Sequence, residues 1–548
     1  MNTSSSALPT PPDATSTEAP PPQHPSTFSP ANLLLLSALS VFGAIIGIEL
    51  LVKLGVTPNT AIIGALVAMI CARVPLRAFA QYRSIHVQNL AQSAISAATF
   101  GAANSLLLPI GIPFLMGRAD LVMPMFIGVS LAMLLDGYML YRMFDTKIFP
   151  ATGTWPQGVA AAEAIKAGDV GGHQARVLGA GLGIGMLGSW FGIPMSAFGT
   201  AFIGNIWALT MLGFGFLLRG YSMPLFGFAV EKAYIPHGMM IGAGIVALLQ
   251  IVRMVWRDRP VRSAADVAAE VPVPTAAGTP SIRRSLRFGG VAYIGLATLV
   301  AFGAGLYADM SPGMLVLFIV YAAFAAFVHE LIVGIAAMHS GWFPAFAVAL
   351  ITLLIGMLIG FPPAALVVLC GFSAATGPAF ADMGYDLRAG FILRGHGSNP
   401  AFELAGRRQQ LMAAMLAFVI AIPVVYFAHS SFFANGQVPP VAAVYVSTIK
   451  AGVAPGVLHS LMLWAIAGAA LQFIGGPKRQ LGVLFSTGLL IANPAAGWAV
   501  LIGIALRFAI ERTAGERVRN TMEVFAAGII AGDAIFSFGS SLIRSRTH

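Results

Sequence analysis

The chain has 548 residues, of which 57% are hydrophobic and only 9% are charged, and its mean hydropathy is +0.82. Soluble domains carry about 25% charged residues, so this composition excludes a water-soluble protein and predicts an all-α polytopic membrane protein. The net charge of +10 is spread over single residues and short loops between apolar runs. That distribution is typical of topology determinants and argues against nucleic-acid binding.

Residues 1–30 differ in composition from everything that follows. They are rich in Ser, Thr, Pro and Ala and contain no Lys or Arg. Such a segment cannot bury an apolar core, so we predict a disordered tail. It also lacks the basic region of a secretory signal peptide, so the apolar run from Leu33 is expected to be a retained membrane helix.

Runs of about 20 apolar residues predict the membrane helices. In the first half they cover 33–54, 59–76, 88–115, 119–140, 176–194, 197–218 and 236–255, with 152–168 as a shorter member. In the second half they cover 288–308, 312–335, 343–360, 362–380, 408–428, 455–475, 481–506 and 520–543. The sequence thus predicts about sixteen helices in two membrane halves, 31–256 and 288–548, joined by a linker at 257–287.

The arginines of the linker indicate that it is cytoplasmic, because basic loops stay on that side. Eight crossings before it place the N-terminus in the cytoplasm, and the basic tail places the C-terminus there too. We therefore expect an integral protein of a bacterial cytoplasmic (inner) membrane. The four arginines within 507–519 disagree with this topology. Either the helix count is wrong there, or that segment is re-entrant.

The two halves share a faint repeat. Trp155–Gly158 and Asn493–Gly497 are Pro/Gly-interrupted segments in comparable places, and each precedes a Gly/Ala-rich helix, at Gly179–Trp190 and Ala526–Phe538. Interrupted helices in matching positions are typical of secondary transporters, whose site lies near the membrane midplane. Chance similarity among Ala/Gly-rich helices is the alternative. The glycines of 179–185 indicate close helix packing rather than a dinucleotide fingerprint.

Glu163 and Lys166 stand among small apolar residues in the segment 153–168, which follows a break. Ionisable groups at membrane depth usually mark a substrate or proton pathway. Glu163 is therefore the first candidate for a proton carrier or for the partner of a substrate amine. In the alternative interpretation, Glu163 simply pairs with Lys166 in the next helical turn.

Asp382 and Asp386 form a second constellation. They are four residues apart, so a helix would put both on one face, near Arg388. Paired carboxylates beside an arginine could bind a cation or exchange a proton. The alternative is an ordinary cytoplasmic loop with solvated charges.

Further polar residues are weaker candidates. His237 lies at the start of a predicted helix. Its role there could be that of a substrate contact, a pH-sensitive group or a helix cap. Others within apolar runs are Asp136, Asn205 and Asp533. His329 and Glu330 lack the second histidine that a zinc-protease motif requires. We expect no cofactor.

Five stretches together resemble the oligopeptide transporter (OPT) family, which includes the yellow stripe-like metal-chelate transporters. They are Trp155–Gly168, Pro236–Gly244, Asp382–Gly390, Gly488–Trp498 and Ala527–Asp533, and their order extends over roughly 85–540. Two departures leave the proton route and the substrate class open. Gln157 stands where the family often has an acidic residue, and Tyr385, Arg388 and Ala389 replace the Gln, Lys and Thr of another family motif.

The resemblance implies proton-coupled symport of short peptides, peptide-like compounds or metal chelates, with a site between pseudo-repeats. Proton coupling is assigned to Glu163, Asp382 and Asp386. Substrate contacts are assigned to Trp155, Pro156, Gln157, Gly158, Lys166, His237, Asn493 and Pro494. The expected partners are the lipid bilayer, the substrate, protons and a possible homo-oligomer. An intramembrane enzyme, whose catalytic set is not assembled at recognisable spacing, and a passive channel are the remaining alternatives.

Overall fold

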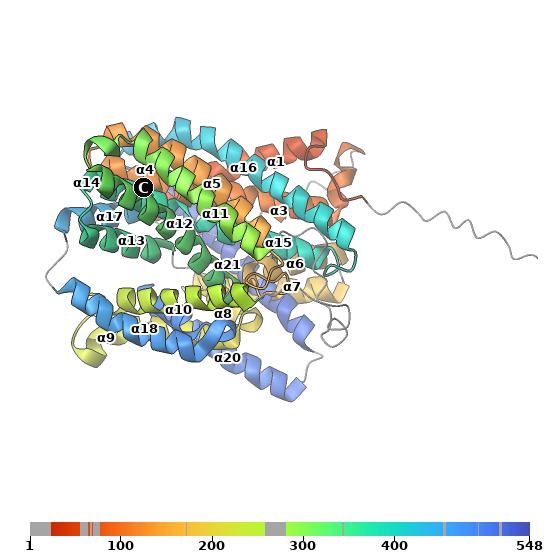
Figure 1. Ribbon diagram of the computed structural model, residues 1–548. Coiled ribbons are helices and arrows are strands. Elements are labelled where there is room, and N and C mark those ends of the chain that lie inside the picture. Colours follow the sequence, from red (N-terminus) through yellow and green to blue (C-terminus); the bar gives the residue numbers. More distant parts are fainter. Residues whose placement is uncertain are drawn as a thin grey trace, which may run out of the picture.

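The computed structural model describes residues 23–54, 64–65, 68–69, 77–170, 172–257, 281–341, 345–452, 456–491, 493–514 and 518–547. This part of the chain is built from helices and contains no strand, apart from a single bridge between Phe144 and Phe149 (Figure 1). The all-α expectation is confirmed. The predicted span 59–76, most of the tail and residues 258–280 of the linker lie largely or wholly outside the described residues.

The first half of the chain forms nine α-helices whose bounds are α1 (Pro30–Leu54), α3 (Ile85–Phe100), α4 (Leu108–Leu115), α5 (Val122–Met143), α6 (Pro156–Val170), α7 (Gly172–Trp190), α8 (Met195–Ile203), α9 (Ile206–Phe226) and α10 (Ile235–Arg257), counted over the described residues. The second half forms α11 (Ile282–Gly303), α12 (Pro312–Ser340), α13 (Ala345–Ile359), α14 (Pro363–Ala375), α15 (Pro378–Leu393), α16 (Pro400–Ala434), α17 (Pro440–Ala451), α18 (Val457–Arg479), α19 (Leu481–Leu490), α20 (Pro494–Ala514) and α21 (Arg519–Thr547).

Length and composition make this an integral membrane protein. Among the described residues, nine helical segments are long and apolar enough to cross a bilayer, and three shorter apolar helices accompany them. Large apolar side chains point outward, and Trp190, Phe427 and Phe473 are each more than 70% exposed. Water would not tolerate such a surface, whereas lipid covers it at no cost.

Several predicted spans are not continuous helices, and two of them are divided where an asparagine caps the following helix. The run 197–218 is divided between α8 and α9, where the Asn205 side chain accepts a hydrogen bond from Ala208 N at 3.2 Å and caps α9. The run 481–506 is divided between α19 and α20, where Asn493 caps α20 through Ala496 N at 3.0 Å. Hydropathy measures apolar continuity and does not register these caps.

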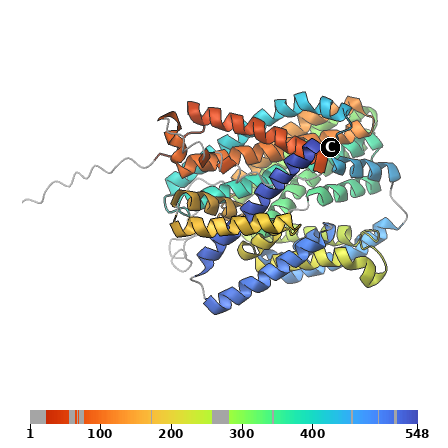
Figure 2. The same cartoon turned by 180° about the vertical axis from the view of Figure 1, so that it is seen from behind.

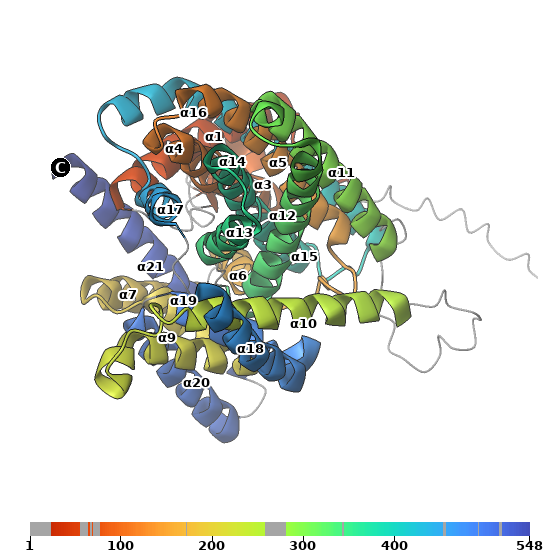
Figure 3. The same cartoon turned by 60° about the vertical axis from the view of Figure 1, so that its left-hand side comes forward.

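The helices form two bundles, which are separated clearly in Figure 1 and seen from behind in Figure 2. The large bundle contains α1, α3, α4, α5 and α11–α17, and the small bundle contains α7–α10 and α18–α21. Each bundle therefore takes helices from both halves of the chain. Helix α6 contacts α3 and α15 of the large bundle as well as α7, α8 and α21 of the small one, and it lies between them in Figure 3.

Glycines bring the small bundle together, as the run 179–185 predicted. A Cβ atom on Gly181 would meet the backbone of Phe525 and Gly528, and one on Gly185 would meet the backbone of Ile529. Helices α7 and α21 thus pack backbone to backbone, which small residues four apart allow in a membrane. The predicted repeat helices Gly179–Trp190 and Ala526–Phe538 are direct neighbours.

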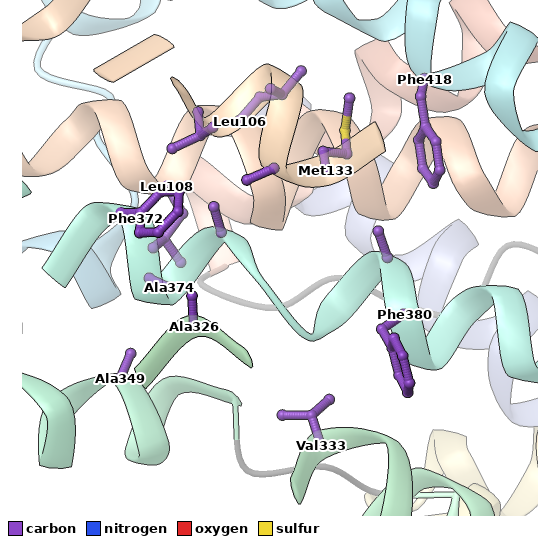
Figure 4. Packing of buried hydrophobic residues seen from close by; sticks show 14 of the residues in the cluster. Leu106, Leu108, Met133, Ala326, Val333, Ala349, Phe372, Ala374, Phe380 and Phe418 are labelled. Atoms are coloured by element: carbon purple, nitrogen blue, oxygen red, sulfur yellow. The ribbon is translucent and has the colours of Figure 1, made fainter. Parts of the chain in front are cut away.

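Two long broken spans form the centre of the large bundle. The segments Ile85–Leu115 and Pro363–Leu393 are the most buried of the nine, with 94% and 100% of their apolar windows buried. The first changes to a π-helix over Gly101–Leu107, and the second is interrupted before Pro378 by Gly377 at φ +96°. Figure 4 shows the second break, with Phe380 just beyond it directed toward Val333. Broken helices in a membrane core are where transporters place polar chemistry.

The described residues that precede α1 are packed against the large bundle. Thr27 is fully buried, and its N–H and hydroxyl group donate to the side-chain and main-chain oxygens of Gln409 in α16, both at 2.8 Å. The last residues of the predicted tail are therefore fixed to the large bundle.

Candidate transport site

The two carboxyl groups predicted to share a helical face do so in the middle of the buried span. Asp382 and Asp386 lie on α15 and are 2% and 0% exposed, so they are not in a solvated loop. The facing helix α3 supplies one partner to each. Ser96 donates its hydroxyl to Asp382 Oδ1, and Gln92 Nε2 donates to Asp386 Oδ1 at 2.5 Å.

This pair has no neutralising cation among the described residues. Neither aspartate forms an ion pair with any Lys, Arg or His in the part of the chain that the structure describes. The Oδ2 atom of each carboxyl group is buried without a hydrogen-bond partner. A buried carboxylate normally fills such positions with donors, so both oxygens are free to bind a proton or a substrate donor.

Gln410 of α16 connects this acidic pair to a second buried polar group. Its Nε2 donates to the main-chain oxygen of Asp386 at 2.6 Å, and its Oε1 accepts from Arg394 Nη1 at 2.7 Å. One polar side chain therefore joins the middle of α15 to the residue that ends it.

A four-residue ion network lies at that end. Arg394 pairs with Glu403 at 2.7 Å, and Arg407 pairs with both Glu403 at 2.7 Å and Asp145 at 2.9 Å. All four side chains are at most 4% exposed. The charge distribution of the sequence predicts topology determinants in the loops between apolar runs. Arg394 and Arg407 are instead buried counter-ions, which hydropathy alone does not reveal.

A third polar group stabilises the break in the span. Asp136 of α5 is fully buried and accepts hydrogen bonds from Gly377 N at 2.8 Å and Phe380 N at 2.9 Å. A carboxylate satisfies the free N–H groups of a helix start and opposes the positive end of its dipole. Asp136 was only a weak candidate in the sequence, because no sequence pattern connects it with a helix start 241 residues away.

A cavity of about 180 Å³ lies between the two breaks. It is lined by Leu51, Asn104, Leu108, Ala345, Phe346, Ala374, Pro378, Val441 and Tyr445. Asn104 belongs to the π-helical stretch and Pro378 to the start of α15. Because Pro378 precedes Asp382 by four residues, about one helical turn, or 6 Å, separates the cavity wall from that aspartate.

The segment that opens α6 is fixed against α15. The main-chain N–H of Trp155 donates to Met338 O at 2.8 Å, and the buried Trp155 ring meets Tyr385 edge-on with centroids 5.8 Å apart. A Cβ atom on Gly384 would overlap the Trp155 ring, and one on Gly158 would overlap the main-chain oxygen of Tyr385. Trp155 and Gly158 thus lie beside the acidic helix, and their role as substrate contacts stays a prediction.

The remaining residues of this segment are placed as follows. Gln157 and Pro156 lie near Gly341 at the end of α12. Glu163 is 6% exposed and accepts from Lys166 Nζ at 3.0 Å, which is the pairing considered as the alternative to a transport role. The Arg388 guanidinium of α15 donates from Nη1 to Ala151 O at 2.6 Å, close to where this segment begins.

Three predicted contacts lie elsewhere, in the small bundle. His237 is buried at the start of α10, beside Tyr234, and its Nδ1 has no hydrogen-bond partner. Asn493 caps α20, and Pro494 packs near Gly220 of α9. The described contacts do not join these residues to Trp155. Asp533, another weak candidate, accepts from Ser189 Oγ and from Ser196 N at 2.7 Å and fastens α21 to α7 and α8.

Comparison with known proteins agrees with the motif resemblance. The family model described as OPT oligopeptide transporter protein matches residues 32–256 and 227–544. Together the two matches cover almost the entire chain after the N-terminal tail. A search of curated proteins found no match to the chain.

Proposed function

The chain belongs to the OPT oligopeptide transporter family, and from this premise we propose that it is a proton-coupled symporter of short peptides that works by alternating access. Family membership and the apolar helices make it a membrane transporter rather than a soluble protein. What we propose beyond that is the coupling ion, the peptide substrate and the mechanism of transport.

The uncompensated pair Asp382 and Asp386 carries the proposal. Two carboxylates one helical turn apart repel each other strongly where the dielectric constant is low and no cation is present. Their described partners are a hydroxyl group, an amide and nothing at either Oδ2. Such a pair is stable when protonated and closed off, and it releases a proton when water reaches it. That is the behaviour that proton coupling requires.

The small volume of the cavity favours a transport mechanism in which helices move. Its volume of about 180 Å³ is smaller than the 300–1,000 Å³ of typical ligand sites. A space of this size takes part of a peptide, such as one side chain, so binding a whole peptide requires the surrounding helices to separate. Helix α6 contacts both bundles and is the element through which we propose that they are coupled.

Glu163 has a lower rank in this proposal than the α15 pair. A partly exposed lysine already compensates its charge, with 32% of the Lys166 side chain accessible. We retain Glu163 as a second proton-coupling residue. Lys166, Pro156, Gln157, His237, Asn493 and Pro494 stay as predicted substrate contacts.

Uptake into proteoliposomes tests the proposal. Full-length protein should accumulate a radiolabelled dipeptide or tripeptide only when the outside is made acidic, and Asp382→Asn should abolish accumulation while peptide exchange continues at zero gradient. Glu231→Gln is the matched control, because that side chain is 57% exposed and lies in the small bundle. Equal, non-accumulating flux with and without the gradient would contradict symport and indicate a channel.

A competition panel then defines the substrate class. Unlabelled peptides should compete for uptake, whereas metal chelates of similar size should not. Competition by chelates alone would assign the protein to metal-chelate transport, the second activity that the family resemblance implies.

A further inference from the structure

Three buried polar side chains from different helices meet at the break before α15. Asp136 of α5, Tyr293 of α11 and Glu330 of α12 are each 0% exposed. Tyr293 donates its hydroxyl to Glu330 Oε2 at 2.7 Å and lies 3.4 Å from Asp136 Oδ1. This group is separate from Asp382 and Asp386, which face α3.

The group is short of one hydrogen-bond donor. The carboxyl groups of Asp136 and Glu330 flank one Tyr293 hydroxyl, at 3.4 Å and 2.7 Å from it, and Glu330 Oε1 is buried with no donor. Two ionised carboxylates can only accept, so two of them around a single hydroxyl are favourable only if one of them carries a proton. Tyr293 has a single hydroxyl proton, and that proton is already directed at Glu330 Oε2.

Among the described residues, no cationic side chain pairs with this group. Neither carboxyl group takes part in an ion pair within the described ranges. From α15 the group receives only main-chain N–H groups, and from α11 only the Tyr293 hydroxyl. His329, next to Glu330 in the chain, is directed at α14, where its Nδ1 lies 2.6 Å from Ser373 O.

We propose that Asp136 and Glu330 share one bound proton and form an occluded proton-binding site at the break in the span. The hydrogen bonds identify the holder of the proton. Asp136 accepts from Gly377 N and Phe380 N, and these bonds favour its ionised form. Glu330 therefore carries the proton and donates it to Asp136. The proposal holds whether or not transport is proton-coupled.

Loss of this proton would change the structure at the break between α14 and α15. Two adjacent buried anions would push Glu330 and α12 away from Asp136, and Asp136 is the cap of α15. The site thus connects the protonation of α12 to the helix start that borders the cavity.

Infrared spectroscopy of the purified full-length protein in detergent tests the proposal, because a protonated carboxyl group has a carbonyl band that a carboxylate lacks. The wild-type spectrum minus that of Glu330→Gln should show one protonated carboxyl group at neutral pH, and the same subtraction with the exposed Glu231→Gln should show none. The amide that Glu330→Gln introduces can donate to Asp136 in place of the carboxyl group, so the variant should fold. The absence of a difference band would overturn the proposal.

Two further measurements keep the test decisive if that variant does not fold. Tyr293→Phe removes the hydrogen bond to Glu330 Oε2, so it should shift the carbonyl band, and an unshifted band would overturn the proposal. Replacing choline chloride with sodium chloride should leave the unfolding temperature unchanged. Stabilisation by sodium that disappears in Tyr293→Phe would indicate a cation site instead. None of these measurements uses an uptake assay. A failure of this proposal can therefore be told apart from a failure of the proposed symport.

Discussion

The two polar regions of α15 use carboxylates in opposite ways. At the end of the helix, Glu403 and Asp145 each lie against arginine, and the four charges of that network sum to zero. In the middle, Asp382 and Asp386 have no cation among the described residues and leave one oxygen each without a donor. A balanced network resists change, whereas an unbalanced pair responds to a proton. We therefore propose that the balanced network is structural and that the unbalanced pair carries the proton.

The largest expected effect comes from breaking the balanced network. Arg394→Leu leaves Glu403 with one counter-ion fewer in a buried site, and removing one partner of a buried pair costs about 3–5 kcal/mol. Unfolding of the detergent-solubilised protein should show this loss. Arg118→Gln is the control, since Arg118 and Asp120 form an exposed pair that contributes little. Equal stability of the two variants would remove the structural role of the network.

The next largest effect concerns the residue that joins the two regions. Gln410→Leu leaves Arg394 Nη1 and the main-chain oxygen of Asp386 without their partner. Burying polar groups without a hydrogen bond costs about 1–3 kcal/mol each. We expect a loss of stability in that range, together with altered proton dependence of uptake. A loss of stability alone would show that the two regions act independently.

The effect of acid on the network is smaller. His24 packs against His86 and Phe402, and burial, together with the positive charge of Arg394, lowers the pKa of His24 from 6.5 to about 4. Between these values the unfolded chain holds a proton that the folded chain does not, so stability falls as the pH is lowered from 6.5 toward 4. His24→Gln should reduce that loss, as measured by unfolding temperature against pH. An identical pH profile would contradict the assignment.

The unbalanced pair should contribute little to stability. Asp382→Asn keeps the volume and can still accept from Ser96, while it removes a buried acid without a counter-ion. We expect the free energy of unfolding to change by less than about 1 kcal/mol, although accumulation is lost. A destabilisation as large as that of Arg394→Leu would make this pair structural too.

The smallest change is expected at Glu163. Its bond to Lys166 spans three residues on one helix and is partly solvated, so Glu163→Gln should cost about 0.2–1 kcal/mol. The uptake assay then decides the role of Glu163. If the variant accumulates peptide fully when driven by protons, only the carboxyl groups of α15 remain as proton-coupling residues.

Local patterns in the sequence predicted the membrane class, the close-packed glycines of α7 and the shared face of Asp382 and Asp386, because each is set by composition or by helical spacing. The partners of these residues were not predictable. Gln92 reaches Asp386 across 294 residues, and Asp136 reaches Gly377 across 241. The interruption at Asn493–Gly497 was predicted from its Pro and Gly, whereas the breaks before α9 and α15 were missed because hydropathy averages over them.

The interleaving of the two halves has a consequence for biogenesis. Helix α7 is synthesised roughly 350 residues before α21, the helix that covers its glycine face. At about 5–20 residues per second, that interval lasts on the order of half a minute. During it, Gly181 and Gly185 must contact lipid or the insertion machinery instead of their final neighbour. The packing of α7 in the small bundle is therefore completed only after α21 has been made, and chains arrested before α21 should leave a cysteine introduced at Gly181 open to thiol reagents.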